Sequence, residues 1–325
     1  MAITQDKKYA ILTSGGDAPG MNAAIRAAVR TALANGLEIY GVKYGFNGLI
    51  KNEMEKMDRG SVSDIIHRGG TVLYTARSKR FHSQEGVQEA VEVCRGQGIS
   101  GVIVVGGDGS FRGARDLSAC GVPCIGVPCT IDNDIACSEY TIGYDTALNT
   151  CIQMIDKLRD TSQSHDRCSV VEVMGRHSGQ LALNVGLATG ATSIVVPEVP
   201  FSFERDILQR IKETSAKGKR HFLIIVAEGV GGVMDLAKRI EEITEIETRP
   251  AILGHVQRGG PPSARDRALA SRLGNAAVEL LLKGESNRVV AVQGSQLEHY
   301  PIEQALNMIK TFDLNLYKMT HMISN

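Results

Sequence analysis

The sequence predicts an α/β protein made of two Rossmann-like three-layer domains with mainly parallel sheets. Short apolar runs that end in glycine or a polar turn alternate with longer amphipathic stretches. Most of these apolar runs lack polar alternation, as expected of strands covered by helices on both faces. The length of 325 residues is about twice that of a common domain. We therefore expect the active site in a cleft between the two domains, at the carboxyl ends of strands.

The elements follow from these two kinds of segment. The apolar runs predict strands at Tyr9–Thr13, Leu37–Val42, Val102–Val105, Cys124–Val127, Ser169–Val173, Ser193–Val196, Phe222–Ala227, Ala251–Leu253 and Val289–Val292. The amphipathic stretches predict helices that include Met21–Ala34, Gln84–Arg95, Tyr144–Arg159, Ser202–Ala216, Ser263–Leu282 and Ile302–Ile309. No low-complexity linker or repeat separates the two halves, so we expect the domains to meet over a broad cleft.

Composition and charge exclude several classes of protein. The 36 Lys and Arg residues balance 36 Asp and Glu residues, which counts against a nucleic-acid partner and against an acidic disordered chain. The first eight residues lack the apolar segment of a signal peptide, and no apolar run approaches the roughly 20 residues of a membrane span. We expect a cytoplasmic protein with no membrane partner. The seven cysteines form no CxxC pair, which predicts reduced and mostly buried thiols, not a zinc site.

A first glycine-rich loop, Thr13–Asn22, follows a predicted strand and opens a helix. Glycines there allow backbone N–H groups to approach an anion, and the helix N-terminus adds positive potential. The loop is either a phosphate loop or a plain glycine turn. The Walker pattern GxxxxGK[ST] does not occur in the sequence, so phosphate transfer would need another architecture.

A second loop carries an acid between glycines, in the run Val102–Ser110. Gly107 and Gly109 can admit triphosphate oxygens close to the backbone, and Asp108 can hold the Mg²⁺ that those oxygens carry. The pattern Gly-Gly-Asp-Gly-Ser is also found in lipid and NAD kinases. It therefore indicates nucleotide use more strongly than it indicates one substrate.

A third loop, within Cys124–Asp134, ends another strand with two carboxylates. Asp132 and Asp134, preceded by Thr130, can divide the roles of base and of metal or orientation partner. A positioned base contributes roughly 10² to 10⁴ in rate. The alternative is an Asx turn in which these residues only cap the backbone.

Together the three loops resemble those of the bacterial ATP-dependent 6-phosphofructokinase family. The resemblance extends through most of the chain, in the runs Lys157–Thr161, Val171–Arg176, Val226–Gly229, Glu247–Arg249, Leu253–Gly260 and Ala268–Gly274. It implies transfer of the γ-phosphoryl group of MgATP to the 1-hydroxyl of fructose 6-phosphate, the committed step of glycolysis, under allosteric regulation.

The resemblance also assigns roles to residues. Asp132 would be the base, with Thr130, Arg176 and Asp134 as the other catalytic residues, and Asp108 would hold Mg²⁺. The ATP positions are Gly16, Arg77, Ser78, Gly107, Asp108, Gly109 and Ser110. The fructose 6-phosphate positions are Thr130, Ile131, Asp132, Met174, Gly175, Arg176, Glu228, His255, Val256, Gln257 and Arg258, joined by Arg167 and Arg249 from a neighbouring subunit.

The implied assembly is a homotetramer with shared sites. A larger ATP-binding domain would comprise residues 1–142 and 256–305, and a smaller fructose 6-phosphate-binding domain residues 143–255 and 306–325. An effector site for ADP or phosphoenolpyruvate would lie between subunits. Its positions are Arg26, Arg30, Arg59, Gly60, Ser61, Val62, Ser63, Asp64, Arg159, Gly190, Ala191, Thr192, Lys217, Lys219, Arg220 and His221.

Three departures from the family pattern bear on these roles. Lys79 and Arg80 replace Pro-Glu near ATP, and Cys129 replaces a glycine. Thr192 replaces the acid that helps to hold the Mg²⁺ of the activator, so we expect weak or altered activation by MgADP.

Three alternative functions stay open at this point. Pyrophosphate-dependent relatives typically carry Lys at the position of Cys129 and Asp at that of Gly109, so ATP is favoured over pyrophosphate as donor. A non-catalytic nucleotide-sensing subunit is disfavoured by Asp132, Asp108 and Arg176. A lipid or NAD kinase would explain only the second glycine loop.

Overall fold

The computed structural model describes residues 7–324 and divides them into two compact units, each built around one sheet. Unit 1 contains the residues up to Thr130, Ile135–Thr146 and Arg258–Lys310. Unit 2 contains Ile131–Asp134, Ala147–Gln257 and the residues from Thr311 onward. The predicted α/β class with two mainly parallel sheets is confirmed. The ligand-binding domain boundaries given above stay a prediction.

Unit 1 holds a seven-stranded sheet in the order β11-β10-β5-β4-β1-β2-β3. The five inner strands β10, β5, β4, β1 and β2 are parallel, and antiparallel pairing in this sheet occurs only where β3 and β11 meet their neighbours. The strands are β1 (Lys8–Thr13), β2 (Glu38–Val42), β3 (Met54–Lys56), β4 (Ile99–Gly106), β5 (Cys124–Pro128), β10 (Arg288–Gln293) and β11 (Gln296–Pro301).

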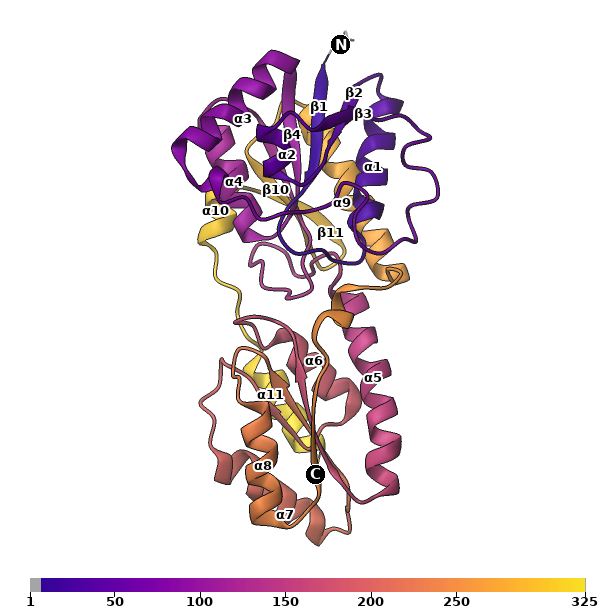
Figure 1. Ribbon diagram of the computed structural model, residues 1–325, viewed down its shortest axis with the longest axis vertical. Helices are drawn as coiled ribbons and strands as arrows, with labels where there is room; N and C mark the ends of the chain where they lie inside the picture. The colour runs from indigo at the N-terminus through magenta and orange to yellow at the C-terminus, as the bar shows by residue number, and fades with distance from the viewer. Residues whose placement is uncertain (1–6, 325) are drawn as a thin grey trace. The chain divides into compact units, whose positions relative to one another are not determined.

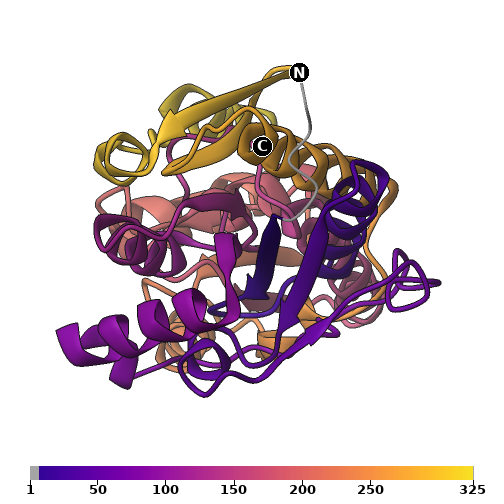
Figure 2. The ribbon, with the colours of Figure 1, turned by 90° about the horizontal axis from the view of Figure 1, so that it is seen from above.

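Helices cover both faces of this sheet. On one face α1 (Met21–Ala34) packs against α9 (Ala264–Leu282), and on the other α3 (Gln84–Gln97) packs against α4 (Asp108–Ala119) (Figure 1). Seen from above, β1 lies between the orange α9 and the violet α3 (Figure 2). The short helices α2 (Phe46–Ile50), η1 (Arg80–His82) and α10 (Ile302–Asn307) lie on the α3 side, where α2 and α10 contribute to the buried core.

Unit 2 holds a four-stranded, fully parallel sheet in the order β7-β8-β6-β9. Its strands are β6 (Cys168–Val173), β7 (Ser193–Val195), β8 (Phe222–Ala227) and β9 (Thr248–Ile252). Alternate side chains of β6 and β8 form a core with η2, α7 and α8, and α6 contacts β7 and β8. These helices are α6 (Gln180–Thr189), η2 (Glu204–Leu208), α7 (Gln209–Ala216) and α8 (Val233–Thr244). Unit 2 also holds α11 (Leu314–Ile323) and most of α5 (Tyr144–Ser164) and η3 (Gly254–Arg258), whose residues 144–146 and 258 belong to unit 1.

Most predicted elements differ from the structure by a few residues at one or both ends, and for three of them the structure shows a local reason. The predicted helix Ser202–Ala216 begins with the π-helical turn η2, where the Asp206 carboxylate accepts a hydrogen bond from the Ser202 N–H, and only then continues as α7. The predicted strand Ala251–Leu253 begins earlier, because Thr248 already pairs with Cys168. The predicted helix Ile302–Ile309 ends at Asn307, since Met308 adopts an extended conformation.

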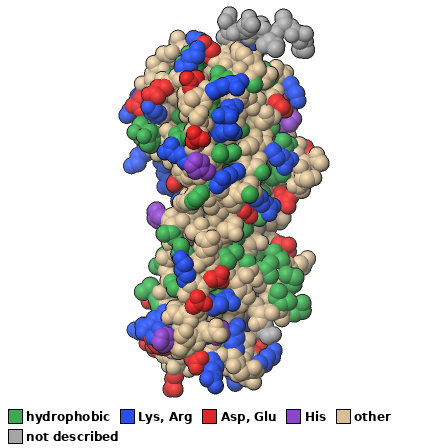
Figure 3. All heavy atoms as spheres, turned by 90° about the vertical axis from the view of Figure 1, so that its right-hand side faces the viewer, with side chains coloured by type: hydrophobic (Ala, Val, Ile, Leu, Met, Phe, Trp, Pro, Cys, Tyr) green, Lys and Arg blue, Asp and Glu red, His purple; other side chains and the backbone are tan. Residues whose placement is uncertain are grey.

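The surface and the helices of the described residues show two further features. Across residues 7–324, none of the helices combines the length and the apolar character needed to cross a bilayer. On the face drawn in Figure 3, positive and negative side chains are interspersed on both units.

Candidate active site

Two glycine loops meet at one edge of the unit 1 sheet. The chain leaves β1 for β2 on one side and later enters β4 on the other side, so β1 and β4 form a topological switch point. Ligands of open α/β sheets bind outside the carboxyl ends of strands at such a point. The Ser14 N–H donates to the Val105 carbonyl at 3.0 Å, which joins the loop after β1 to the end of β4.

Steric contacts explain several of the glycines at this edge. A Cβ on Gly106 would lie 2.5 Å from the Ser14 carbonyl oxygen and 2.4 Å from the Ser110 Oγ, so no side chain fits there. Around Gly107 and Gly109, in contrast, an added Cβ would meet no heavy atom within 4 Å. This open space flanks Asp108, which is half-buried and begins α4 at the positive end of its helix dipole.

Arg258 closes over the first loop. Its guanidinium donates to the Asp17 carbonyl at 3.1 Å, and a Cβ on Gly16 would lie 2.6 Å from the Arg258 Nη1. The structure therefore brings together Gly16, predicted for ATP, and Arg258, predicted for the sugar phosphate.

The segment that carries Arg77 and Ser78 is tied to the same loop. The Thr75 hydroxyl donates to the Gly15 carbonyl at 2.8 Å. Arg77 is exposed, whereas Ser78 is buried and its hydroxyl accepts a hydrogen bond from the Phe81 N–H. Of the two cations that replace Pro-Glu, Arg80 forms an ion pair with Glu89 and Lys79 is exposed.

The third loop begins beside the second one. The Cys129 N–H donates to the Gly106 carbonyl at 2.9 Å, and the Thr130 N–H donates to the Ile142 carbonyl at 3.0 Å. Burial raises the pKa of the Cys129 thiol well above its usual value, which keeps this thiol neutral. Six of the seven cysteines are buried and none is paired with another, so the predicted burial of most thiols is confirmed.

In unit 2, the predicted base lies beside a predicted cation. Asp132 is 2% exposed, and its Oδ2 lies 3.6 Å from the Arg176 Nε. Asn133 and Arg176 both have left-handed φ angles, 48° and 53°. Strained backbone of this kind in residues other than glycine is concentrated at functional sites.

Two side chains, the half-buried Glu228 and the buried Gln257, shape the loop that carries Arg176. The Glu228 Oε1 accepts hydrogen bonds from the Gly175 N–H at 3.1 Å and the Arg176 N–H at 2.5 Å. The Gln257 Oε1 accepts from the Met174 N–H at 3.0 Å, while its Nε2 donates to the Gly254 carbonyl. These loops follow β6, β8 and β9, three neighbouring strands, and so meet at one sheet edge.

Burial limits how some predicted sugar phosphate residues could act. Gln257 and Ile131 are both completely buried, so Gln257 serves the loop and Ile131 presents no exposed group to a ligand. His255 is exposed and Val256 is 53% exposed. Asp134 is half-buried, two residues beyond Asp132.

Arg167 and Arg249 lie at the opposite end of the strands. Arg167 immediately precedes β6 and Arg249 lies near the start of β9, so six residues of β6 separate them from the Arg176 loop. At about 3.3 Å per residue this is roughly 20 Å. Both arginines pair with Glu247, and they lower its pKa. Within one chain these two cations do not join the Asp132 and Arg176 pair.

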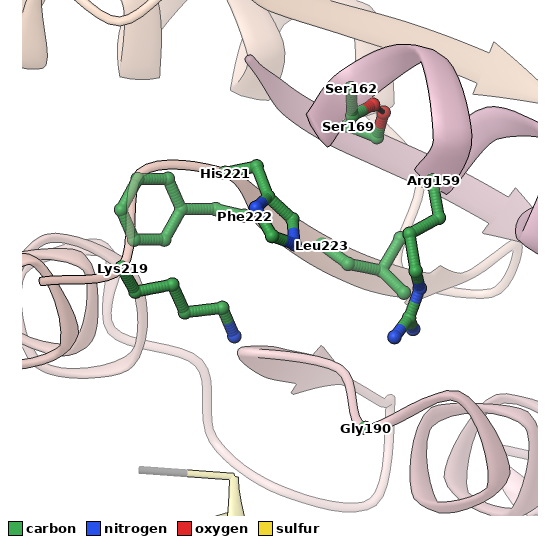
Figure 4. Close-up of a pocket in the computed structure, with 8 residues that line it drawn as sticks. All are labelled: Arg159, Ser162, Ser169, Gly190, Lys219, His221, Phe222 and Leu223. Carbon is green, nitrogen blue, oxygen red and sulfur yellow. Dashed lines mark hydrogen bonds between the residues drawn. The ribbon is translucent and has the colours of Figure 1, made fainter. Parts of the chain in front are cut away.

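A pocket of unit 2 is lined by several predicted effector residues. Arg159, Gly190, Lys219 and His221 line it, and in Figure 4 the Arg159 and Lys219 side chains end in the space between His221 and Gly190. Burial and the neighbouring cations lower the pKa values of Lys219 and His221. The Lys219 Nζ donates to the Thr192 hydroxyl at 3.2 Å. Thr192 thus accepts a hydrogen bond from this ammonium group but does not neutralise its charge.

The other predicted effector residues have different surroundings. Ala191 is buried, Lys217 is exposed, and Arg220 forms an exposed ion pair with Asp166. Arg26 and Arg30 lie on α1 of unit 1. A separate, largely exposed turn of unit 1 contains the other predicted effector residues, of which only Val62 is buried: Arg59, Gly60, Ser61, Val62, Ser63 and Asp64.

An aromatic pair beside the first loop has no role predicted from the sequence. Tyr44 and Tyr74 stack with ring centroids 5.0 Å apart, and both are exposed with left-handed φ angles. The Thr13 hydroxyl donates to the Tyr74 carbonyl at 2.7 Å, which places the pair at the switch point. The two tyrosines are 30 residues apart, so no local pattern in the sequence signals the stack.

Known proteins of one family are similar to this chain over nearly its whole length. The family model described as Phosphofructokinase matches residues 8–281. The chain is 54% identical over 318 residues to the ATP-dependent 6-phosphofructokinase of Shouchella clausii, covering 98% of this chain and 99% of that protein. A solved phosphofructokinase from Saccharomyces cerevisiae superposes with a TM-score of 0.89 at 34% identity, and the match covers 97% of this chain but 50% of the yeast chain.

A second solved structure is similar to this chain in its fold. The pyrophosphate-dependent phosphofructokinase of Marinobacter aquaeolei superposes with a TM-score of 0.85 at 24% identity, covering 95% of this chain and 86% of that one. From the family model and the extent of identity to its relatives, the chain belongs to the phosphofructokinase family.

Proposed function

We propose that the protein is an ATP-dependent 6-phosphofructokinase that transfers the γ-phosphoryl group of MgATP to the 1-hydroxyl of fructose 6-phosphate, giving fructose 1,6-bisphosphate and ADP. The observation that carries this proposal is the buried Asp132 carboxylate, 3.6 Å from the Arg176 guanidinium on a strained loop. The identities of donor and acceptor come from the names of the relatives, which are about half identical in sequence over nearly the whole chain.

Asp132 acts as the general base in this proposal. Its carboxylate accepts the proton of the 1-hydroxyl as that oxygen attacks the γ-phosphorus, and Thr130 orients the reacting groups. Arg176 stabilises the charge that spreads over the transferring phosphoryl oxygens, which is the main task of an enzyme in this chemistry. Asp134 acts as an electrostatic partner of the base.

The donor is proposed to bind at the switch point of unit 1. Gly107 and Gly109 leave room there for phosphate oxygens, and the N-terminus of α4 favours their negative charge. Gly16, Ser110, Arg77 and Ser78 complete the proposed donor site.

The residues at this point fit a magnesium ion that arrives with the nucleotide. No cluster of three or more His, Cys, Asp or Glu side chains that could hold a metal occurs within residues 7–324, so a resident all-protein site is not indicated. Mg²⁺ characteristically takes one or two carboxylates and completes its shell with phosphates and water. Asp108 would supply that carboxylate. The ion, when bound, neutralises charge on the β- and γ-phosphates.

The acceptor is proposed to bind at the carboxyl edge of the unit 2 sheet. Glu228 and Gln257 hold the backbone of Met174, Gly175 and Arg176 in the shape that meets the sugar phosphate. His255 supplies a further polar contact at this edge, and Arg258, which belongs to unit 1, is proposed to contribute its cation to the sugar phosphate.

A homotetramer with shared sites is part of the proposal. Arg167 and Arg249 sit at the amino edge of the unit 2 sheet, far from their own Arg176 loop, which favours a role in a neighbouring subunit. The pocket with Arg159, Lys219 and His221 is proposed to bind ADP or phosphoenolpyruvate, and we propose that the enzyme acts in the cytoplasm.

An assay of donor choice tests the proposal. Initial rates of fructose 1,6-bisphosphate formation are measured with ATP or with pyrophosphate, at saturating fructose 6-phosphate and Mg²⁺. We expect turnover with ATP and little with pyrophosphate. Faster turnover with pyrophosphate would show that pyrophosphate, not ATP, is the donor. Binding of both substrates without any product would indicate a nucleotide-sensing subunit.

A further inference from the structure

Asp266 is a buried acid for which the proposed reaction has no direct use. It lies in the first turn of α9, and its side chain is completely buried. An unpaired buried carboxylate is costly, so its hydrogen bonds are expected to matter to the structure around it. Burial raises the pKa of this carboxyl group, while its hydrogen bonds oppose the rise.

The Asp266 carboxylate caps a different helix from its own. Its Oδ1 accepts a hydrogen bond from the Gly143 N–H at 2.9 Å. Its Oδ2 accepts from the Thr146 N–H at 2.8 Å and from the Thr146 hydroxyl at 2.5 Å. These are groups at the N-terminus of α5, where Gly143 has no side chain that could form a cap. Asp266 therefore supplies the missing cap from α9.

The two helix ends are linked in both directions. The Ser263 N–H donates to the Thr146 hydroxyl at 2.9 Å, and the Ser263 hydroxyl donates to Asp145 at 2.5 Å. The Ser263 Oγ also accepts from the Asp266 N–H and so caps α9. Each helix start is thus held by side chains of the other, and two carboxylates face two positive helix ends.

The segment that Asp266 holds is also the support of the third loop. Residues 141–143 run directly into α5. The Thr141 hydroxyl donates to the Thr130 carbonyl at 2.7 Å, and the Thr130 N–H donates to the Ile142 carbonyl at 3.0 Å. Both backbone groups of Thr130 therefore depend on this segment, and Asp132 follows two residues later in the chain.

Two other loops converge on the same carboxylate. A Cβ on Gly20, at the end of the first glycine loop, would lie 3.7 Å from the Asp266 Cβ and 2.5 Å from the Ile142 side chain. The loop that carries Arg258 ends at Ser263, three residues before Asp266. Loops containing Gly16, Thr130 and Arg258 therefore all reach this junction.

We infer that Asp266 is a positioning residue for phosphoryl transfer, which sets the geometry of the Thr130 loop through Gly143 and Thr146. This inference rests on the proposed function. Asp266 touches no substrate in this role. Its loss lowers kcat by misplacing reacting groups, and a misplacement of about 1 Å costs roughly 10²-fold in rate.

The Asp266→Asn variant tests the inference. The amide has the shape of the carboxylate, but it offers one NH₂ group where the three donors need an acceptor oxygen. We expect kcat to fall by roughly 10²-fold while the KM values for ATP and fructose 6-phosphate change little. Amide hydrogen exchange in the segment 128–146 is expected to speed up under native conditions.

Asp206→Asn is the matched control. Asp206 is also a buried acid near a helix start, where it accepts from the Ser202 N–H and pairs with Arg205, but these contacts lie in unit 2 and involve no proposed site residue. We expect this variant to lose stability yet to keep its kcat and the exchange rates of segment 128–146. Thr146→Val, which removes one hydroxyl, is expected to lower kcat in the same direction as Asp266→Asn but by less, and it serves as the test if Asp266→Asn does not fold.

Two results would overturn the inference. One is an Asp266→Asn or Thr146→Val enzyme that melts earlier but keeps normal kcat. The other is segment 128–146 exchanging equally fast in Asp266→Asn and Asp206→Asn. A wild-type protein that makes no fructose 1,6-bisphosphate contradicts the proposed function instead, and the exchange comparison then still tests the contacts of Asp266.

Discussion

Replacing Asp132 with asparagine removes the proposed base with little change of shape. Asp132 is 2% exposed, so the surroundings hold the new side chain where the carboxylate stood. The amide cannot take the proton of the 1-hydroxyl. The variant also loses its attraction to Arg176, but that side chain is half exposed, which limits the pair to about 1 kcal/mol of folding free energy. We therefore expect a folded protein.

The expected loss is in kcat. A positioned general base is worth roughly 10² to 10⁴ in rate, which corresponds to about 3 to 5 kcal/mol in the activation barrier. Substrate contacts other than Asp132 stay in place, so the KM values should change much less than kcat.

A coupled assay for ADP release at saturating Mg²⁺ gives both constants. Asp166→Asn is a suitable control, because Asp166 is exposed, pairs with Arg220 at 3.7 Å and has a left-handed φ that asparagine accepts. This control should keep the wild-type kcat. If Asp132→Asn keeps its kcat within a factor of about ten, below the range for a general base, the role of Asp132 is refuted.

Three further predictions concern other parts of the chain. Burial lowers the pKa of His321 from 6.5 to about 4. The folded protein should therefore have its full stability above pH 6.5 and lose about 3 kcal/mol of unfolding free energy as the pH drops towards 4. Urea unfolding at several pH values measures this loss, and the dependence of the unfolding free energy on pH should be weaker in His321→Phe. At Gly109 an added Cβ meets no heavy atom within 4 Å, and Gly109→Asp should raise the KM for ATP because it sets a negative charge beside the proposed phosphates; an unchanged KM would remove Gly109 from the donor site. ADP titration at subsaturating fructose 6-phosphate should show weak activation, because Thr192 offers no acid for Mg²⁺ beside Lys219, and strong activation would contradict this.

Much of the fold follows from local patterns. Met21–Ala34 and Phe222–Ala227 have the predicted bounds, because one is an apolar-faced helix and the other a fully buried parallel strand. The predictions missed α6 and α8, and also the short or exposed elements β3, β11 and α2. β11 carries mostly exposed side chains, and its pairing with β10 leaves no apolar pattern to detect.

Some residues of the candidate site could likewise be predicted from the sequence and others could not. The glycines and acids of the site could be predicted from the sequence, because they directly follow apolar runs that predict strands. The buried role of Gln257 was not, since its partners come from Met174 and Gly254. Asp266 lies in the run Ala-Arg-Asp-Arg, which resembles a solvated helix start, and its partners are 120 and 123 residues away. Only the folded chain brings such groups together.

The central claim is the transfer of a phosphoryl group from ATP to fructose 6-phosphate. Phosphorus NMR of a mixture of the protein with both substrates and Mg²⁺ tests it most directly, because it identifies each phosphorylated product. We expect fructose 1,6-bisphosphate and ADP in equal amounts from the wild-type protein, and far slower formation of both by Asp132→Asn. ATP hydrolysis to ADP and phosphate without the bisphosphate, or no reaction at all, would contradict it.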